Sequence, residues 1–213
     1  MPRTSDARDR LMNAAMDLIW ENSYGGISVD AICEKAGAKK GSFYHFFESK
    51  SELAVAALEA DWQHKKARMD EIFSASVAPL ERLRAYFRHV YQGQTKRHGE
   101  CGSVLGCPYC TLGAEVVTQD RAIGRQIQKI LDRNSRYFES AIRDAHAQGV
   151  IFAPDARAKA RILVAFFQGS LTQARIENDC GPLRGLAAGA LELLGAKGRG
   201  RVGNRIRREY QRG

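Results

Sequence analysis

The stretch from Ile27 to Lys50, ISVDAICEKAGAKKGSFYHFFESK, constrains the fold of this chain more than any other segment. Ser28 is a good N-cap for a first helix, because its hydroxyl oxygen can accept a hydrogen bond from an amide of the first turn. Gly37 can take the left-handed conformation that a sharp reversal needs, so we expect it to end this helix. A second short helix is predicted from about Lys40 to Phe47. Two short helices that cross at a glycine turn are typical of a helix-turn-helix.

The second helix of this pair is rich in side chains that can donate hydrogen bonds to phosphates and base edges. We expect the DNA-contacting residues to be Ser28, Lys39, Lys40, Gly41, Ser42, Tyr44, His45 and Lys50. Ser42 and His45 are the candidates for base edges, whereas Tyr44 and Lys50 are the candidates for phosphates. A purely structural three-helix module is the alternative. The crowding of aromatic and basic residues on one short helix favours DNA binding.

The same segment resembles the DNA-binding domain of the TetR family of transcriptional repressors. The phrase KGSFYHFFESKSEL, residues 40–53, places Gly41, Ser42, Tyr44, Phe47, Lys50 and Leu53 where the family has its characteristic residues. The upstream segment LIWENSYGGISVDAICEKAGA matches as well. The family often opens its recognition helix with Ser or Thr, where this chain has Lys39, so the operator preference does not carry over. The resemblance implies a homodimer that binds a pseudo-palindromic operator in double-stranded DNA and is released by an inducer.

Apolar residues recur at helical spacing along the rest of the chain, without the alternation of strands, so we predict an all-α fold. Beyond the helix-turn-helix, helices are expected at about 51–74, 79–95, 109–117, 120–148, 156–178 and 182–194. Three parts follow from this pattern: a three-helix DNA-binding domain (1–50), a helical ligand-binding and dimerisation domain (51–195), and a basic disordered tail (196–213).

The charge distribution qualifies the net charge of +9, which by itself favours an anionic partner. Residues 1–50 hold seven Lys or Arg and seven Asp or Glu, so basic groups must cluster locally to bind DNA. No apolar run has the length of a membrane span or of a signal peptide, so we expect a cytoplasmic protein with no membrane partner. We find no phosphate-binding glycine loop and no nucleophile–base pair. An enzyme is therefore not predicted, and no cofactor is expected.

The last two predicted helices carry small and apolar residues on faces that could meet a second copy of the chain. The expected dimer interface comprises Ile162, Phe166, Ser170, Leu186 and Leu191. The resemblance implies that these helices form a four-helix interface between two protomers. An internal pair of core helices is the alternative reading of the same pattern.

Three of the five cysteines, Cys101, Cys107 and Cys110, lie close together in the segment HGECGSVLGCPYC. They could form a thiol sensor for an oxidant or electrophile, in which one thiolate reacts and a neighbour resolves it as a disulfide. They could instead bind a metal together with His98, although their spacing matches no strong zinc pattern. The third possibility is that they only pack in the core of the domain.

Aromatic residues at helical spacing could line an apolar cavity for a small-molecule inducer, although such residues more often form plain core. The candidates are Trp62, Phe87, Tyr91, Tyr137 and Phe167. The best hypothesis from sequence is a repressor released by a small ligand or by modification of the cysteines. A metal-responsive repressor and a constitutive DNA-binding protein without a ligand are the alternatives.

Overall fold

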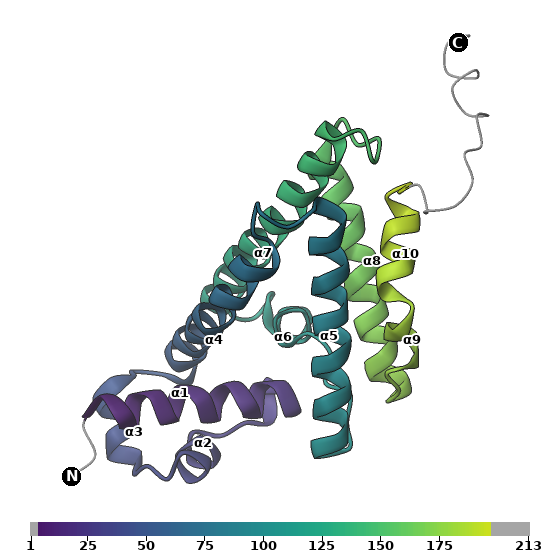
Figure 1. Ribbon diagram of the computed structural model, residues 1–213. Helices are drawn as coiled ribbons and strands as arrows, with labels where there is room; N and C mark the ends of the chain where they lie inside the picture. The colour runs from purple at the N-terminus through teal and green to yellow at the C-terminus, as the bar shows by residue number, and fades with distance from the viewer. Residues whose placement is uncertain (1–3, 197–213) are drawn as a thin grey trace.

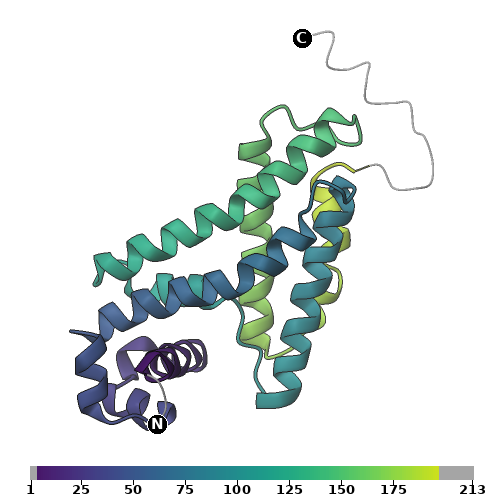
Figure 2. The ribbon, with the colours of Figure 1, turned by 60° about the vertical axis from the view of Figure 1, so that its left-hand side comes forward.

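The computed structural model describes residues 4–196, and every regular element in that range is helical, which confirms the all-α prediction. Helices α1 to α3 form one end of the molecule, α4 and α7 run side by side away from it, and α5, α8 and α10 stand together on the other side (Figures 1 and 2). The elements are α1 (Thr4–Glu21), η1 (Tyr24–Gly26), α2 (Val29–Ala36), α3 (Lys40–Phe46), α4 (Lys50–Ile72), α5 (Pro79–Cys101), α6 (Pro108–Val116), α7 (Arg121–Ala147), α8 (Ala156–Glu177), α9 (Gly181–Arg184) and α10 (Leu186–Leu193).

The helix-turn-helix forms as its local residues dictate. The Ser28 hydroxyl accepts a hydrogen bond of 3.1 Å from the Ala31 amide and so caps α2. Gly37 has φ of +59°, and the Ala38 amide donates to the Cys33 carbonyl, so α2 ends in a Schellman turn. The short turn that follows brings α3 across α2.

Two apolar cores hold the helices together, and α4 belongs to both. Its first half, with Leu58 and Trp62, packs with α1, α2, α3, α6 and the start of α7. Its last turn, with Met69 and Ile72, packs with α5, α8, α10 and the rest of α7. The first core thus passes through residue 50, where we predicted the boundary between the DNA-binding domain and the following helices. A displacement of α4 would therefore change the packing of both cores.

Two details of the helices differ from the prediction. Helix α5 continues to Cys101, where a loop was predicted from Lys96 onwards, and it ends only at Gly102, whose φ is +73°. The predicted last helix is two helices, because the chain turns at Gly185 between α9 and α10. Both cases involve ends of helices, which depend on tertiary contacts as well as on local sequence.

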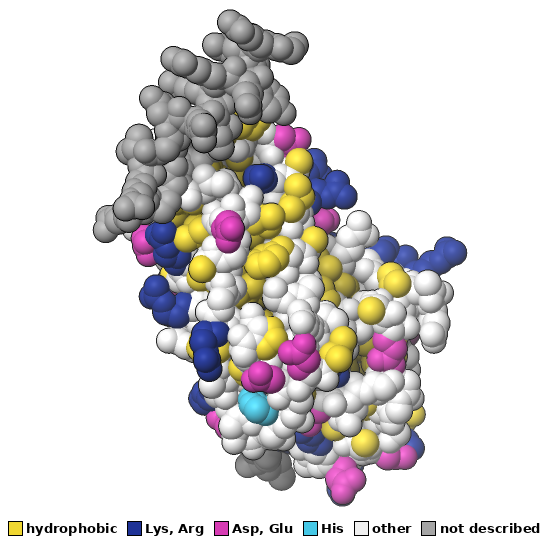
Figure 3. All heavy atoms as spheres, turned by 90° about the vertical axis from the view of Figure 1, so that its right-hand side faces the viewer, with side chains coloured by type: hydrophobic (Ala, Val, Ile, Leu, Met, Phe, Trp, Pro, Cys, Tyr) yellow, Lys and Arg dark blue, Asp and Glu magenta, His cyan; other side chains and the backbone are white. Residues whose placement is uncertain are grey.

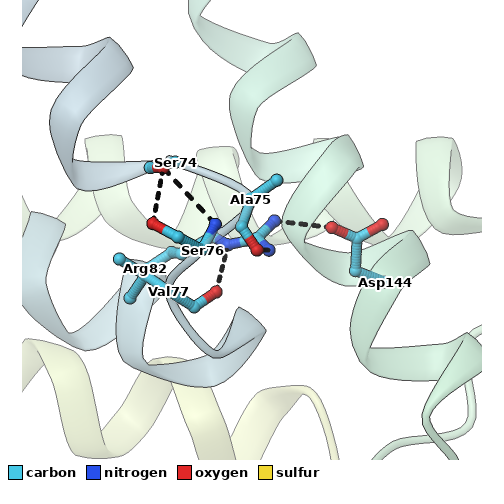
Figure 4. Close-up of polar contacts among 6 residues, drawn as sticks. All are labelled: Ser74, Ala75, Ser76, Val77, Arg82 and Asp144. Carbon is cyan, nitrogen blue, oxygen red and sulfur yellow. Dashed lines mark hydrogen bonds and ion pairs between the residues drawn. The ribbon is translucent and has the colours of Figure 1, made fainter.

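A buried arginine fixes the turn between α4 and α5 (Figure 4). Arg82 is 3% exposed, and its guanidinium donates to the carbonyls of Val77 at 2.7 Å and Ala75 at 3.2 Å. It also pairs with the Asp144 carboxylate of α7 at 2.5 Å. The turn that follows α4 is therefore linked to α7 through the side chain of Arg82.

Within residues 4–196 no helix is both long enough and apolar enough to cross a bilayer. The basic tail predicted from residue 196 lies outside the described residues except for Ala196.

Candidate functional site

The outer face of α3 is the candidate DNA interface. Phe43 and Phe47 anchor the helix in the core, while Tyr44 is 58% exposed on the opposite side. The remaining predicted DNA-contacting residues at this end are exposed or half-buried, namely Ser28, Lys39, Lys40, Gly41, Ser42 and His45. Lys40 is paired with Asp30 at 2.9 Å, whereas Lys39 has no carboxylate partner among the described residues. A Cβ atom on Gly41 would meet nothing within 4 Å, so a DNA backbone could approach closely there.

Lys50 does not match its predicted role as a phosphate ligand. Its ammonium donates to the carbonyls of Tyr24 at 3.0 Å and Ile27 at 2.9 Å, and it lies 4.2 Å from the centre of the Tyr24 ring. These contacts hold η1 against the start of α4. We therefore remove Lys50 from the DNA-contacting set and assign it to the packing of the helix-turn-helix.

The carboxylate of Glu115, on α6, also contacts the η1 turn. Glu115 accepts hydrogen bonds from the Ser23 hydroxyl at 2.6 Å, the Gly25 amide at 2.9 Å and the Tyr24 amide at 3.1 Å. Burial acts to raise the pKa of Glu115, but these hydrogen bonds and the charge of Lys50 outweigh it and lower that pKa below its ordinary value. Helix α6 is thus linked directly to the loop that precedes α2.

The other end of α6 borders a cavity of about 380 Å³ that is lined by helices α1, α4, α5, α6, α7 and α8. Its walls combine five aromatic side chains and several aliphatic ones with nine charged or polar ones, and a mixture of apolar surface and polar groups is typical of small-molecule sites. Of the predicted ligand residues, Trp62, Phe167 and Cys107 line it. Phe87 and Tyr137 lie instead in the core, and Tyr91, Cys101 and Cys110 lie away from the walls.

Two adjacent backbone carbonyls at the edge of the cavity accept hydrogen bonds from three helices. The Gly106 oxygen accepts from the Trp20 indole at 3.1 Å and from the Gln94 amide at 3.0 Å. The neighbouring Leu105 oxygen accepts from Arg175 of α8 at 2.7 Å. The loop that leads into Cys107 is therefore held by α1, α5 and α8 together, so a change in this loop would reach the DNA-binding end through Trp20.

Cys107 and Cys110 lie together at the first turn of α6. A hydrogen bond from the Cys110 thiol lowers the pKa of Cys107 below its ordinary value, and the nearby charge of Lys65 acts in the same direction against the effect of burial. The same hydrogen bond raises the pKa of Cys110. Cys107 is the thiol of this pair that ionises first, which makes it the stronger nucleophile near neutral pH.

Cys101 stands apart from this pair, at the exposed C-terminal end of α5. The metal alternative, which combined His98 with the three cysteines, is contradicted: residues 4–196 contain no group of three or more His, Cys, Asp or Glu side chains that could hold a metal ion. The physical reason is the extension of α5, which carries His98 and Cys101 on the helix instead of in the loop beside Cys107.

Helices α8 and α10 present a partly apolar face to solvent (Figure 3). Ile162 is 52% exposed and Ile176 is 80% exposed on α8, and between them lie Phe166 and Gly169 at helical spacing. Leu186 was predicted on this interface but is 1% exposed inside the chain, where it packs in the second core. Ser170 and Leu191 remain half-buried on this side.

Several cavity residues were absent from the prediction, chiefly Trp20, Lys65, Tyr86, Gln94, Arg97, Tyr109 and Gln168. They come from five helices, and no spacing within one helix signals that they meet. Trp20 is the most informative omission, because it belongs to α1 of the predicted DNA-binding domain and yet forms part of the cavity wall.

Two protein-family models match the segments that contain α3 and most of the cavity walls. Residues 11–57 match the family model described as bacterial regulatory proteins, tetR family, and residues 79–189 match that of the tetracyclin repressor-like C-terminal domain. The chain is 31% identical to the transcriptional regulator AcuR of Cereibacter sphaeroides, over 85% of this chain and 82% of that protein. It is 25% identical to the transcriptional repressor NemR of Escherichia coli, over 89% of this chain and 94% of that protein. A crystal structure of the regulatory protein TetR from Rhodobacter sphaeroides superposes with a TM-score of 0.79 at 28% identity, covering 88% of this chain and 98% of that one.

Proposed function

We propose that this chain, which belongs to the TetR family of bacterial regulatory proteins, is a homodimeric repressor that binds a pseudo-palindromic operator through α3. The observation that carries this proposal is the outer face of α3. Two phenylalanines bury one side of the helix, and Lys39, Tyr44 and His45 stand exposed on the other. A short helix anchored in this way can enter a major groove with its polar side chains toward the bases and phosphates.

The α8–α10 face supports dimerisation. Gly169 lies in the middle of α8, where glycine costs about 1 kcal/mol relative to alanine, and a Cβ atom there would meet nothing within 4 Å in the chain. Packing within one protomer therefore gives no reason for this glycine. A helix of a second copy, crossing closely at Gly169 between Ile162 and Ile176, would explain both the glycine and the exposed apolar side chains.

Release of the operator would begin in the cavity. A ligand there contacts Trp20 of α1 and Pro108 of α6 at once. At its other end α6 holds η1 through Glu115, so movement of α6 would shift the helix-turn-helix relative to α4. The ligand regulates DNA binding only if it binds the non-competent conformer more tightly than the competent one.

Modification of Cys107 is the covalent route to the same displacement. Its thiolate can add to an electrophilic carbon–carbon double bond next to a carbonyl, and a solvent proton then completes the adduct at the neighbouring carbon. A peroxide would instead give a sulfenic acid with loss of hydroxide, and attack by the Cys110 thiol would then expel water and form a disulfide. Either product changes the volume at the start of α6.

The test of DNA binding uses the charge of Lys39. Lys39→Ala should weaken operator binding and lower the salt slope by about 1 for each protomer, because one phosphate contact is lost from each recognition helix. Arg157→Ala is the matched control, since Arg157 is exposed at the start of α8, at the end of the molecule far from α3 (Figure 1). Fluorescence anisotropy over a salt series measures both variants. An unchanged slope for Lys39→Ala would refute the placement of α3 on DNA.

The test of release adds an electrophile such as N-ethylmaleimide to the protein–operator complex. Wild-type protein should dissociate, and Cys107→Ser should stay bound, while Cys101→Ser should behave as wild type because Cys101 lies outside the cavity. Operator binding that no cavity ligand or thiol reagent changes would identify a constitutive DNA-binding protein.

A further inference from the structure

We infer that the cavity takes a small planar anion that also carries a hydrogen-bond donor, a class represented by the hydroxybenzoates. The inference rests on the proposed function in one respect, namely that the cavity is the inducer site. Three independent features of the walls support it: an uncompensated positive charge, an acceptor without a donor, and aromatic surfaces.

The positive charge is that of Arg97. Four lysines and arginines line the cavity, and three of them are neutralised by carboxylates, in the pairs Lys65–Asp61 at 2.7 Å, Arg68–Glu71 at 2.8 Å and Lys96–Glu100 at 3.7 Å. Arg97 has no carboxylate partner within residues 4–196, and its guanidinium lies 4.1 Å from the centre of the Trp20 ring. The only histidine of the wall, His89, does not add to this charge near neutral pH, since burial and the charge of Arg68 lower its pKa. A guanidinium that lies over an indole ring can still donate hydrogen bonds from its N–H groups to a carboxylate.

The acceptor is the side-chain oxygen of Gln168 on α8. Among residues 4–196 it is the one buried side-chain nitrogen or oxygen without a hydrogen-bond partner, and Gln168 belongs to the cavity wall. A buried carbonyl oxygen without a donor is costly, so such an atom calls for a partner. A carboxylate cannot supply one, because it only accepts. A hydroxyl or amino group on the ligand, in addition to its anionic group, would supply the missing donor.

The walls set the shape of the ligand. Trp20, Trp62, Tyr86, Tyr109 and Phe167 contribute aromatic surface around a volume of about 380 Å³, which is near the lower end for ligand pockets. Flat aromatic molecules gain most from such surroundings, since rings pack against rings in offset or edge-on arrangements. A single-ring acid with one donor group satisfies all three features.

The cavity also provides its own reporter, because both tryptophans of the chain line it. The test titrates DNA-free protein with 3-hydroxybenzoate, 4-hydroxybenzoate, benzoate, phenol and tyramine, and follows tryptophan fluorescence, with calorimetry as the second readout. At least one hydroxybenzoate should bind about tenfold or more tightly than benzoate, which lacks the donor, and than phenol, which lacks the charge. Tyramine, a cation, should bind more weakly than phenol.

Variants assign each preference to its residue. Arg97→Gln should remove the advantage of hydroxybenzoate over phenol, and Arg97→Lys should retain part of it. Gln168→Leu should remove the advantage over benzoate. Arg88→Gln, on the exposed side of the same helix and outside the cavity, should retain both preferences. Circular dichroism confirms that each variant is folded, and the conservative Arg97→Lys change keeps the charge testable should Arg97→Gln unfold.

The proposal is overturned if phenol or tyramine binds the wild type as tightly as both hydroxybenzoates, or if Arg97→Gln leaves the preference unchanged. Since the titration contains no DNA, its failure is separate from failure of the proposed function. A protein that selects an operator but ignores aromatic acids refutes the ligand class alone. A protein that binds hydroxybenzoate but selects no DNA refutes the repressor.

Discussion

Replacing Glu115 by alanine should destabilise the protein by about 2 kcal/mol at pH 7. Three hydrogen bonds from Ser23, Tyr24 and Gly25 end on this carboxylate, at 2.6, 3.1 and 2.9 Å. Hydrogen bonds to a charged group are worth about 1.5–3 kcal/mol each when buried. Glu115 is only half-buried, so water can replace part of what is lost, and the three bonds share one carboxylate. We therefore expect far less than their sum.

The loss should depend on pH in a defined direction. The pKa of Glu115 is lower in the folded protein than its ordinary value of 4.5, because the hydrogen bonds favour the ionised form more than burial opposes it. The carboxylate therefore contributes its stability above about pH 4.5, and this contribution is lost as the pH falls through the folded-state pKa. Wild type and Glu115→Ala should therefore approach each other in stability as the pH falls below about 4.5.

Thermal and urea unfolding at fixed protein concentration measure this difference. A change of 2 kcal/mol corresponds to roughly 4–8 °C in Tm for a chain of this size. Asp132→Ala is the control, since Asp132 is an exposed carboxylate on α7 and should change stability by less than about 0.5 kcal/mol. Two results would refute the proposal that Glu115 stabilises η1. One is an equal loss of stability in Glu115→Ala and Asp132→Ala at pH 7, and the other is a stability difference between wild type and Glu115→Ala that grows on acidification.

Three further substitutions test other parts of the molecule. The rate of Cys107 alkylation by iodoacetamide should rise with pH around a midpoint below the ordinary thiol value of about 8.5, and Cys110→Ala should move that midpoint up, because the thiolate loses its donor; an unmoved midpoint excludes the pair. Arg82→Met should cost about 1–3 kcal/mol in urea unfolding, since the carbonyls of Ala75 and Val77 lose their donor and Asp144 loses its partner, and a neutral effect would show that water satisfies these groups. Gly169→Arg should leave the protomer folded but convert the dimer to a monomer in light scattering, and a persisting dimer would place the interface elsewhere.

Local sequence was sufficient for features whose physics is local. Ser28 and Gly37 bound α2 as expected, since a cap and a left-handed turn depend on a few neighbouring residues. The sequence from Ser49 to Glu52 has the Ser-x-x-Glu pattern of a capping box, and the structure forms only part of that motif. Ser49 accepts from the Glu52 amide as a capping box requires, but the Glu52 carboxylate accepts from the amide of Glu48 instead of that of Ser49.

The misplaced residues all depend on contacts between distant segments. Lys50 was expected at a phosphate because it follows the recognition helix, but the carbonyls of Tyr24 and Ile27 lie within its reach once α4 has packed. Leu186 has the same local pattern as Leu191, and only the approach of α10 to α5 and α8 decides that Leu186 is buried. Arg97 was predicted in a loop, and its position over Trp20 follows from the continuation of α5.

The central claim, that two α3 helices read one operator, is tested most directly by selecting bound sequences from random duplex DNA with the purified wild-type protein. The account predicts an enriched pseudo-palindrome whose half-sites are centred about 34–36 Å apart, or a multiple of that distance, because a symmetric dimer places its two recognition helices in successive major grooves. Enrichment of a single unpaired half-site, or no enrichment over several rounds of selection, would contradict it.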